Sequence, residues 1–342
     1  MHYQNKKIIA TFLLILALLL APVGAMAADS EMLVPGGHTA GVKLFSEGVI
    51  VVGFSEVQTD SGVCSPAQDA GLVRGDIITK VGETKVNSLE ALTACLLSAD
   101  PVPVYVSRNG KEMEFRITPA NDGGVYKLGV WGRDSIAGIG TITYYDPETG
   151  VFGALGHGIN DVVTLQLIPL YSGSIMKSSI TGIRKGESGS PGELQGKFDV
   201  NSDAGDLYLN SDFGIFGVLN EDSLLQNRQA VPVASPSEVT TGDATILSNI
   251  AGDQVKEYSI KIVTIYSQNS QEQRNMMIEI TDPELLQQTG GIVQGMSGSP
   301  ILQNGKLVGA VTHVLVNDPK RGYGIFLQNM MDKAASVPAK AA

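Results

Sequence analysis

Residues 127–332 alternate short apolar stretches with turns about every ten residues, and this rhythm limits the possible folds more than any other feature. Few segments in this part of the chain have the spacing of a helix. A strand-rich domain of roughly 200 residues fits a pair of β-barrels, so the predicted fold class is mainly β. The clearest predicted strands lie at 138–143, 151–155, 213–218, 259–266, 276–280, 306–312 and 323–326.

The first 27 residues have the pattern of a secretory signal peptide. Lys6 and Lys7 precede an apolar run over 8–23, and the small residues Ala25 and Ala27 mark a cleavage site. An uncleaved N-terminal anchor is the alternative, and either segment brings the chain close to a membrane. Cleavage would remove the two lysines and no acidic residue, which takes the formal charge from −11 to −13. An acidic exported chain argues against nucleic acid as a partner.

Residues 28–38 are predicted to be a flexible lead, and residues 39–119 alternate strands with two short helices. Ser88 is a candidate N-cap of the second helix, and Asn109-Gly110 is a favoured two-residue turn between strands at 102–108 and 111–118. Residues 120–126 read as a linker to a domain at 127–332, and residues 333–342 as a frayed tail.

The order of elements in residues 39–119, together with Gly75-Asp76-Ile77-Ile78, resembles a PDZ domain. Such domains bind an extended peptide along a sheet edge, with a loop of backbone amides at its carboxylate. That resemblance places the peptide-binding loop at Gly48, Val49 and Ile50. A domain that only packs on its neighbour is the alternative.

Residues 295–300 read Gly-Met-Ser-Gly-Ser-Pro, a pattern typical of the nucleophile loop of chymotrypsin-like serine proteases. Gly295 allows a turn in which the amides of Gly295 and Ser297 point at one oxygen, forming an oxyanion hole. Gly298 leaves room for a substrate above the hydroxyl of Ser297. A plain Gly/Ser turn between two strands is the alternative.

His157 follows a predicted strand and lies between two glycines, which leaves its ring open to approach. It precedes Ser297 in the chain, so we predict that it is the general base for that hydroxyl. His313, on the strand after the nucleophile loop, is the competing candidate and is interpreted as structural or substrate-facing. Ser188 lies in a second Gly-x-Ser-Gly-Ser-Pro at 186–191, but its polar flanks favour Ser297 as the nucleophile.

The acidic partner of His157 is harder to identify, because Asp282, the first choice, and Asp161, the runner-up, could each also cap a helix or turn. Asp282 lies upstream of Ser297 and directly before Pro283, whereas Asp161 lies shortly after His157. From the chemistry alone, both stay open.

The remaining reactive side chains predict no cofactor. The two cysteines, Cys64 and Cys95, could form a disulfide in an exported chain, although Cys95 lies in an apolar helical pattern that suits a buried thiol. The four histidines have no metal-ligand spacing, so no metal site is predicted.

Taken together, these motifs resemble the stage IV sporulation protein B peptidase family over about residues 33–332. The resemblance implies a PDZ domain followed by a chymotrypsin-like double β-barrel, and a triad of His157, Asp282 and Ser297. It also implies an exported signalling peptidase of endospore-forming bacteria, in the space between the two spore membranes. There it would cleave itself and a membrane-bound regulator of an intramembrane protease. The segments that carry the resemblance are residues 133–141, 153–158, 295–300 and 309–319.

Two other functions fit parts of the sequence. A peptide-binding adaptor with an inactive protease fold would keep the domains without the chemistry, but His157 and Ser297 are both present. A quality-control protease of the high-temperature-requirement type shares the chemistry, but its PDZ domain follows the protease domain, whereas here it comes first.

Overall fold

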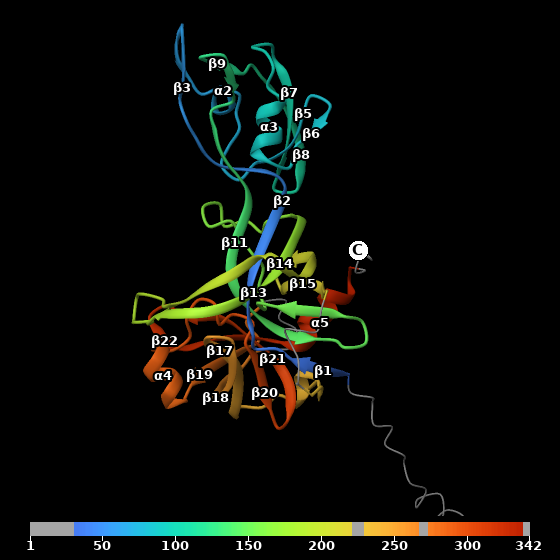
Figure 1. Ribbon diagram of the computed structural model, residues 1–342, viewed down its shortest axis with the longest axis vertical. Helices are drawn as coiled ribbons and strands as arrows, with labels where there is room; N and C mark the ends of the chain where they lie inside the picture. The colour runs from blue at the N-terminus through green and yellow to red at the C-terminus, as the bar shows by residue number, and fades with distance from the viewer. Residues whose placement is uncertain (1–30, 221–228, 267–272, 338–342) are drawn as a thin grey trace, which may run out of the picture. The chain divides into compact units, whose positions relative to one another are not determined.

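The computed structural model describes residues 31–220, 229–266 and 273–337. This part of the chain is mainly β, as the sequence predicts, and its strands form two antiparallel barrels (Figure 1). A smaller module of strands and two short helices lies between two strands of the first barrel in the chain order.

The first barrel is a closed circuit of pairings in which each strand is hydrogen-bonded to the next and the last returns to the first. Its interior is filled by apolar residues that include Val42, Phe152 and Ile215. Two short strands, β1 (Met32–Pro35) and β16 (Val231–Pro232), extend it beside β11. Around the circuit the strands are β2 (Thr39–Phe54), β11 (Val130–Tyr145), β12 (Val151–Ala154), β15 (Gly214–Leu219), β14 (Glu193–Ser211) and β13 (Leu170–Arg184).

The second barrel is also closed, and buried and exposed side chains alternate along strands such as β18. Along β18 the side chains of Tyr258, Ile260 and Ile262 are buried, whereas Ser259 and Lys261 between them are exposed, because successive strand residues face opposite sides. Its strands in order are β17 (Gly242–Ala251), β18 (Gln254–Ile265), β19 (Met276–Ile280), β22 (Asp318–Phe326), β21 (Lys306–Leu315) and β20 (Pro300–Gln303).

Short helical segments flank the second barrel. Helix α4 (Pro283–Thr289) follows β19, the 3-10 turn η2 (Pro236–Glu238) precedes β17, and α5 (Leu327–Ala335) follows β22. Leu327 and Met330 of α5 are fully buried in a cluster with Phe216 of the first barrel, so this helix joins the two barrel cores.

The module between β2 and β11 has its own core, with Val49, Leu92 and Val104 among its buried residues. The predicted hairpin is confirmed: Asn109 and Gly110 both have positive φ, as a two-residue turn of this kind requires. The elements of the module are β3 (Val57–Thr59), β4 (Gly62–Cys64), α2 (Pro66–Asp69), β5 (Ile77–Val81), β6 (Thr84–Lys85), α3 (Leu89–Ala94), β7 (Val102–Arg108), β8 (Lys111–Ile117), β9 (Ala120–Asp122) and β10 (Val125–Lys127).

The module interrupts the first barrel, whereas the sequence predicts a separate domain over 39–119 that precedes it. Residues 39–46 of β2 pair with β11 and β13 inside the barrel, and only the later part of the same strand pairs with β5 of the module. The predicted linker at 120–126 contains the β9–β10 hairpin. The predicted flexible lead at 28–38 contains β1, and α5 reaches Ala335 inside the predicted tail at 333–342.

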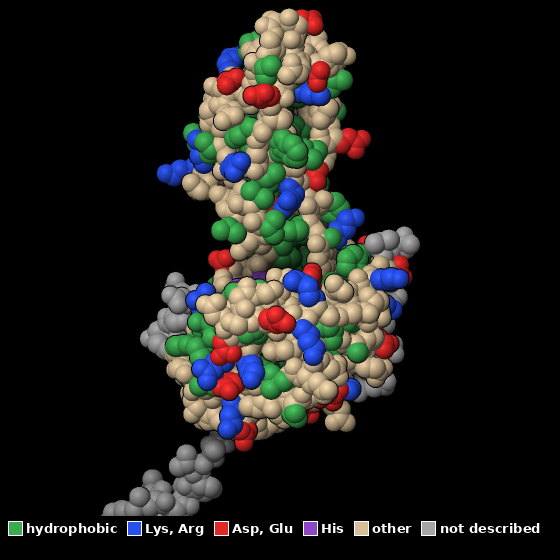
Figure 2. Space-filling model, turned by 90° about the vertical axis from the view of Figure 1, so that its left-hand side faces the viewer, with side chains coloured by type: hydrophobic (Ala, Val, Ile, Leu, Met, Phe, Trp, Pro, Cys, Tyr) green, Lys and Arg blue, Asp and Glu red, His purple; other side chains and the backbone are tan. Residues whose placement is uncertain are grey.

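The predicted signal segment at 1–27 lies outside the described residues. Among the helices that the structure does describe, none has the length and apolar character needed to cross a membrane. On the face drawn in Figure 2, acidic and basic side chains are mixed with apolar ones rather than gathered by sign.

Candidate active site

The loop that carries Ser297 is bound to the first barrel by two threonines of β11. The amide of Thr141 donates to the carbonyl of Ser297 at 3.0 Å, and its hydroxyl donates to the carbonyl of Gly295 at 2.7 Å. The hydroxyl of Thr143 donates to the carbonyl of Gly298 at 2.8 Å. The predicted nucleophile of the second barrel is therefore held by hydrogen bonds that one backbone amide and two hydroxyls of the first barrel donate to its loop.

Gly298 is required by close approach as well as by conformation. Its φ is +95°, and a Cβ at this position would lie 2.0 Å from the carbonyl oxygen of Thr141. No side chain fits there, since real Cβ atoms do not approach backbone atoms so closely. Gly298, which the sequence predicts to leave room for the substrate, is thus also required for the close contact between the two barrels.

The amides of Gly295 and Ser297, the predicted oxyanion hole, donate no hydrogen bond within the described part of the chain. Gly295 has a φ of +98°, which a glycine adopts without strain. Two neighbouring N–H groups left free beside a hydroxyl are what an oxyanion hole requires. Their catalytic role stays a prediction.

The backbone turns sharply just before His157. The amide of Gly156 donates to the carbonyl of Ala154, two residues back, at 2.9 Å, and Leu155 between them has a φ of +69°. A three-residue turn with positive φ is rare and strained, above all for a branched residue. The amide of Leu155 donates to the carbonyl of Thr141 at 3.1 Å, so Thr141 binds both the His157 loop and the Ser297 loop.

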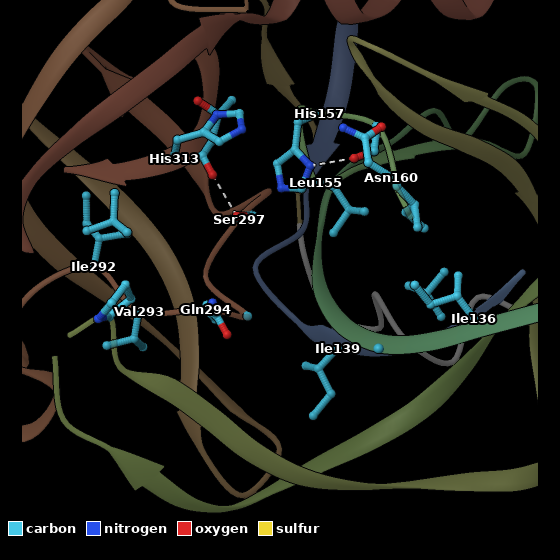
Figure 3. A pocket seen from close by; sticks show the side chains of 18 of the residues that line it. Ile136, Ile139, Leu155, His157, Asn160, Ile292, Val293, Gln294, Ser297 and His313 are labelled. Carbon is cyan, nitrogen blue, oxygen red and sulfur yellow. Dashed lines mark hydrogen bonds between the residues drawn. The ribbon is translucent and has the colours of Figure 1, made fainter. Parts of the chain in front are cut away.

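His157 and Ser297 line the same pocket, whose volume is ≈490 Å³ (Figure 3). Within the described residues no hydrogen bond joins them. The hydroxyl of Ser297 instead donates to the carbonyl of Thr312 at 2.7 Å. The hydrogen bond to Thr312 must therefore break before the proton of Ser297 can reach His157.

The ring of His157 is held in a form suited to accept a proton. Its Nδ1 lies 2.9 Å from the carbonyl oxygen of Gly158, which only accepts, so Nδ1 carries the hydrogen and Nε2 has a free lone pair. Burial lowers the pKa of His157, and the Gly158 carbonyl partly opposes that effect. The imidazole is consequently neutral at pH 7.

His313 packs beside His157, with ring centroids 4.9 Å apart and the planes tilted by 39°. Burial, and then the nearby His157 and Arg274, lower the pKa of His313 to about 4. Its Nδ1 is buried and has no hydrogen-bond partner among the described residues. His313 thus lies in the pocket as a neutral ring, and its interpretation as structural or substrate-facing stays a prediction.

Asp282, the predicted acidic member, is the N-cap of α4. One carboxylate oxygen accepts from the amide of Leu285 at 2.9 Å and the other from the amide of Ser259 at 3.3 Å. Asp282 does not line the pocket that contains His157. The structure does not bring these two side chains together, so the catalytic role of Asp282 stays a prediction.

Asp161, the other candidate, is fully buried, and its carboxylate already accepts hydrogen bonds from other groups. It accepts from the guanidinium of Arg133 at 2.8 Å and from the amides of Val163 and Thr164 at 2.9 and 2.8 Å. A carboxylate that is bound in this way holds the loop after His157 without contacting the ring itself.

The predicted peptide-binding residues Gly48, Val49 and Ile50 lie in β2, and of the three only Ile50 is paired on both strand edges. Val49 and Ile50 pair with β5 on one side, and Ile50 pairs with β11 on the other. A Cβ on Gly48 would lie 2.4 Å from the carbonyl of Ile78. Ile50 therefore has no free edge for a peptide, whereas within the described residues β11 pairs with neither Gly48 nor Val49. The peptide-binding role of these residues stays a prediction.

The second Gly-x-Ser-Gly-Ser-Pro loop borders the pocket without presenting its serine there. The Ser188 hydroxyl donates to the carbonyl of Asn317 at 2.9 Å and is exposed, whereas Pro191 lines the pocket. Cys64 and Cys95 are both free thiols in this structure.

Thr141, Thr143 and the Gly158 carbonyl are the positioning groups that the sequence analysis missed. Thr141 ends the segment 133–141 that carries part of the family resemblance, and both threonines are fully buried polar residues on a strand. A buried threonine is a weak signal in a sequence, because only the folded structure shows what its hydroxyl binds.

Comparison with known proteins adds the family. The family model for the SpoIVB peptidase S55 matches residues 124–331. The Rv3671c protease from M. tuberculosis in its active form is similar at 15% identity and a TM-score of 0.35, over 60% of this chain and 76% of that one. The thermostable serine protease AL20 from an extremophilic microorganism is similar at 11% identity and a TM-score of 0.27, over 88% and 99%. A search among curated proteins finds no match.

Proposed function

This chain belongs to the SpoIVB peptidase S55 family of serine peptidases, and we propose that it is an endopeptidase with Ser297 as nucleophile and His157 as general base. The observation that supports this assignment best is the position of Thr141. One residue of β11 binds the loop of the predicted nucleophile and the loop of the predicted base, beside one pocket that both side chains line.

The proposed reaction begins with a turn of the Ser297 side chain from the Thr312 carbonyl toward Nε2 of His157. His157 takes the hydroxyl proton as the oxygen bonds to the substrate carbonyl carbon, and the amides of Gly295 and Ser297 stabilise the oxyanion. The carbon–nitrogen bond then breaks as the imidazolium returns the proton to the leaving amine. Water, deprotonated by the same ring, hydrolyses the acyl-enzyme and restores the serine.

The Gly158 carbonyl supplies part of what an acidic residue supplies in a triad. It accepts the Nδ1 hydrogen, so it fixes the tautomer and the ring plane. A neutral carbonyl stabilises the imidazolium less than a carboxylate does. The third member predicted by resemblance, Asp282, could fill that role only if the N-cap of α4 opened.

For the physiological role we propose processing of itself and of a membrane-bound regulator that controls an intramembrane protease during endospore formation. The family's name, which refers to SpoIVB, and the signal-like segment at 1–27 support this proposal. The chain would be exported across the cytoplasmic membrane and act between the two spore membranes. The module between β2 and β11 would hold the substrate or control self-cleavage, and its assignment as a PDZ domain stays a prediction.

The test is processing of the chain itself by two variants with a matched change. Ser297→Ala should abolish self-cleavage, since loss of the nucleophile in such enzymes costs on the order of 10⁶-fold in rate. Ser188→Ala removes the same hydroxyl oxygen from the second Gly-x-Ser-Gly-Ser-Pro motif and should leave processing unchanged. Undiminished cleavage of the chain in Ser297→Ala would show that Ser297 is not the nucleophile and would contradict the proposed mechanism.

A further inference from the structure

Among the residues that the structure describes, no charged side chain lines the pocket beside Ser297. None of its lining residues is Asp, Glu, Lys or Arg, and its polar members are the groups of the proposed chemistry and a few neighbours, such as Gln294 and Asn160. Apolar side chains make up the rest of the wall. A volume of ≈490 Å³ lies within the range of sites that enclose a drug-sized ligand, so it exceeds the need of one side chain.

The apolar residues lie on two sides of the nucleophile. Figure 3 shows Ile292 and Val293 on one side of Ser297 and Ile136 and Ile139 on the other. The first pair belongs to the Ser297 loop itself, and Val314 of β21 packs against the same apolar cluster. Val316, in the turn after β21, lines the same pocket. The second pair belongs to β11 of the first barrel.

The proposed chemistry assigns a different part of the substrate to each side. The acyl group stays bound to Ser297 until water removes it, so its side chain lies against the wall of the Ser297 loop. The leaving amine takes its proton from His157, so it lies on the side of the first barrel. Each half of the substrate therefore meets aliphatic side chains.

We propose, resting on the function above, that this peptidase cleaves within apolar segments. The residue on the amino side of the cleaved bond is aliphatic or aromatic and is held by Ile292, Val293, Val314 and Val316. A charged side chain would lose its hydration in this subsite without meeting a partner, which opposes its binding. Pockets that contain a counter-charge select basic or acidic residues, and this pocket has none.

The experiment uses diphenyl phosphonate probes that carry a leucine-like, lysine-like or aspartate-like side chain, with a small fluorophosphonate that carries none. For the unaltered chain, the leucine-like probe should label Ser297 at least about 100-fold faster than either charged probe. A fastest reaction with a charged probe, or equal rates for all three, would overturn the proposal. If neither the fluorophosphonate nor any phosphonate labels Ser297, the proposed function fails and this inference fails with it.

Val316 provides the matched variants because it lines the pocket yet is 48% exposed, so a charge there leaves the core intact. Val316→Glu should raise the relative labelling by the lysine-like probe about tenfold, and Val316→Lys should not. Val263, 39% exposed on β18 and not part of the pocket lining, is the control: Val263→Glu should leave all ratios unchanged. An equal response to Val316→Glu and Val263→Glu would contradict the subsite.

Discussion

Residues 186–191 and 295–300 differ only in their second position, yet the structure gives the two loops different surroundings. In the first loop Glu187 and Ser188 are exposed, and a Cβ added to Gly189 would meet nothing within 4 Å. In the second loop Met296 is fully buried, and a Cβ on Gly298 would collide with the carbonyl of Thr141. The same motif is a surface turn in one place and a rigid contact between two barrels in the other.

The motif therefore does not make a nucleophile by itself. Preorganised amides and a held hydroxyl need neighbours that leave the loop one conformation. For the second loop those neighbours are the threonines of β11. The first loop is held by hydrogen bonds within its own turn and by bonds that it donates to the carbonyls of Val316 and Asn317.

The largest effect on folding is expected from a methyl group at the two equivalent glycines. Gly298→Ala should cost more than about 4 kcal/mol of unfolding free energy, because it combines left-handed strain with a backbone collision. Gly189→Ala, at a φ of +81° but in open space, should cost only about 1–2 kcal/mol. Urea denaturation measures both, and equal losses would remove the contrast.

The next largest difference in unfolding free energy is expected between substitutions at the second positions of the two loops. Met296→Ala removes a fully buried side chain of the second barrel's core and should cost about 2–5 kcal/mol. Glu187→Ala changes an exposed side chain and should stay within about 0.5 kcal/mol. A small effect of Met296→Ala in the same denaturation assay would show that the Ser297 loop is not anchored by its core contact.

Lowering the pH should decrease the stability of the folded chain because the pKa of His313, beside Ser297, is lower in the folded chain than in the unfolded chain. The pKa of His313 falls to about 4 in the folded chain against an ordinary value of 6.5, so the unfolded chain binds more protons between those values. Stability is thus fully present above pH 6.5 and declines as the pH falls toward 4. His313→Gln should decline less than the unaltered chain over that range, as measured by urea midpoints at each pH, and an identical decline would contradict this.

The pKa of His157 is also lowered, so a base in its neutral form should persist below pH 6.5. The rate of Ser297 labelling by a fluorophosphonate should stay level at neutral pH and fall with a midpoint below 6.5. A midpoint above 6.5 would mean that a nearby negative charge holds the ring protonated, which this arrangement does not provide.

The smallest change is expected at Asp282. Asparagine caps a helix about as well as aspartate, so Asp282→Asn should keep α4 and leave the labelling rate within a few-fold. A loss of about 10⁴-fold, the size seen when the acid of a triad is replaced by its amide, would show that Asp282 reaches His157 in the working enzyme.

Local patterns in the sequence predict local structure well. The Asn109-Gly110 turn, the Ser88 cap and strand β19 (Met276–Ile280) follow from turn chemistry, capping and alternation, and the structure has all three. His157 and Ser297 stand out because glycines flank them. The structure places these two side chains in one pocket, which a sequence pattern could only suggest.

Long-range pairing accounts for what the sequence could not show. β2 alternates without a break across the point where it passes from the barrel to the module, so nothing in its sequence marks that boundary. Both edges of β2 at Ile50 are paired with strands that follow later in the chain. Whether Asp282 caps a helix or serves a histidine depends equally on its distant neighbours.

The most direct measurement is to find which serine a fluorophosphonate labels, by mass spectrometry of the digested full-length chain. We expect the label on Ser297, none on Ser188, and a large loss of labelling in His157→Ala. A label on Ser188, or labelling of Ser297 that does not depend on His157, would contradict it.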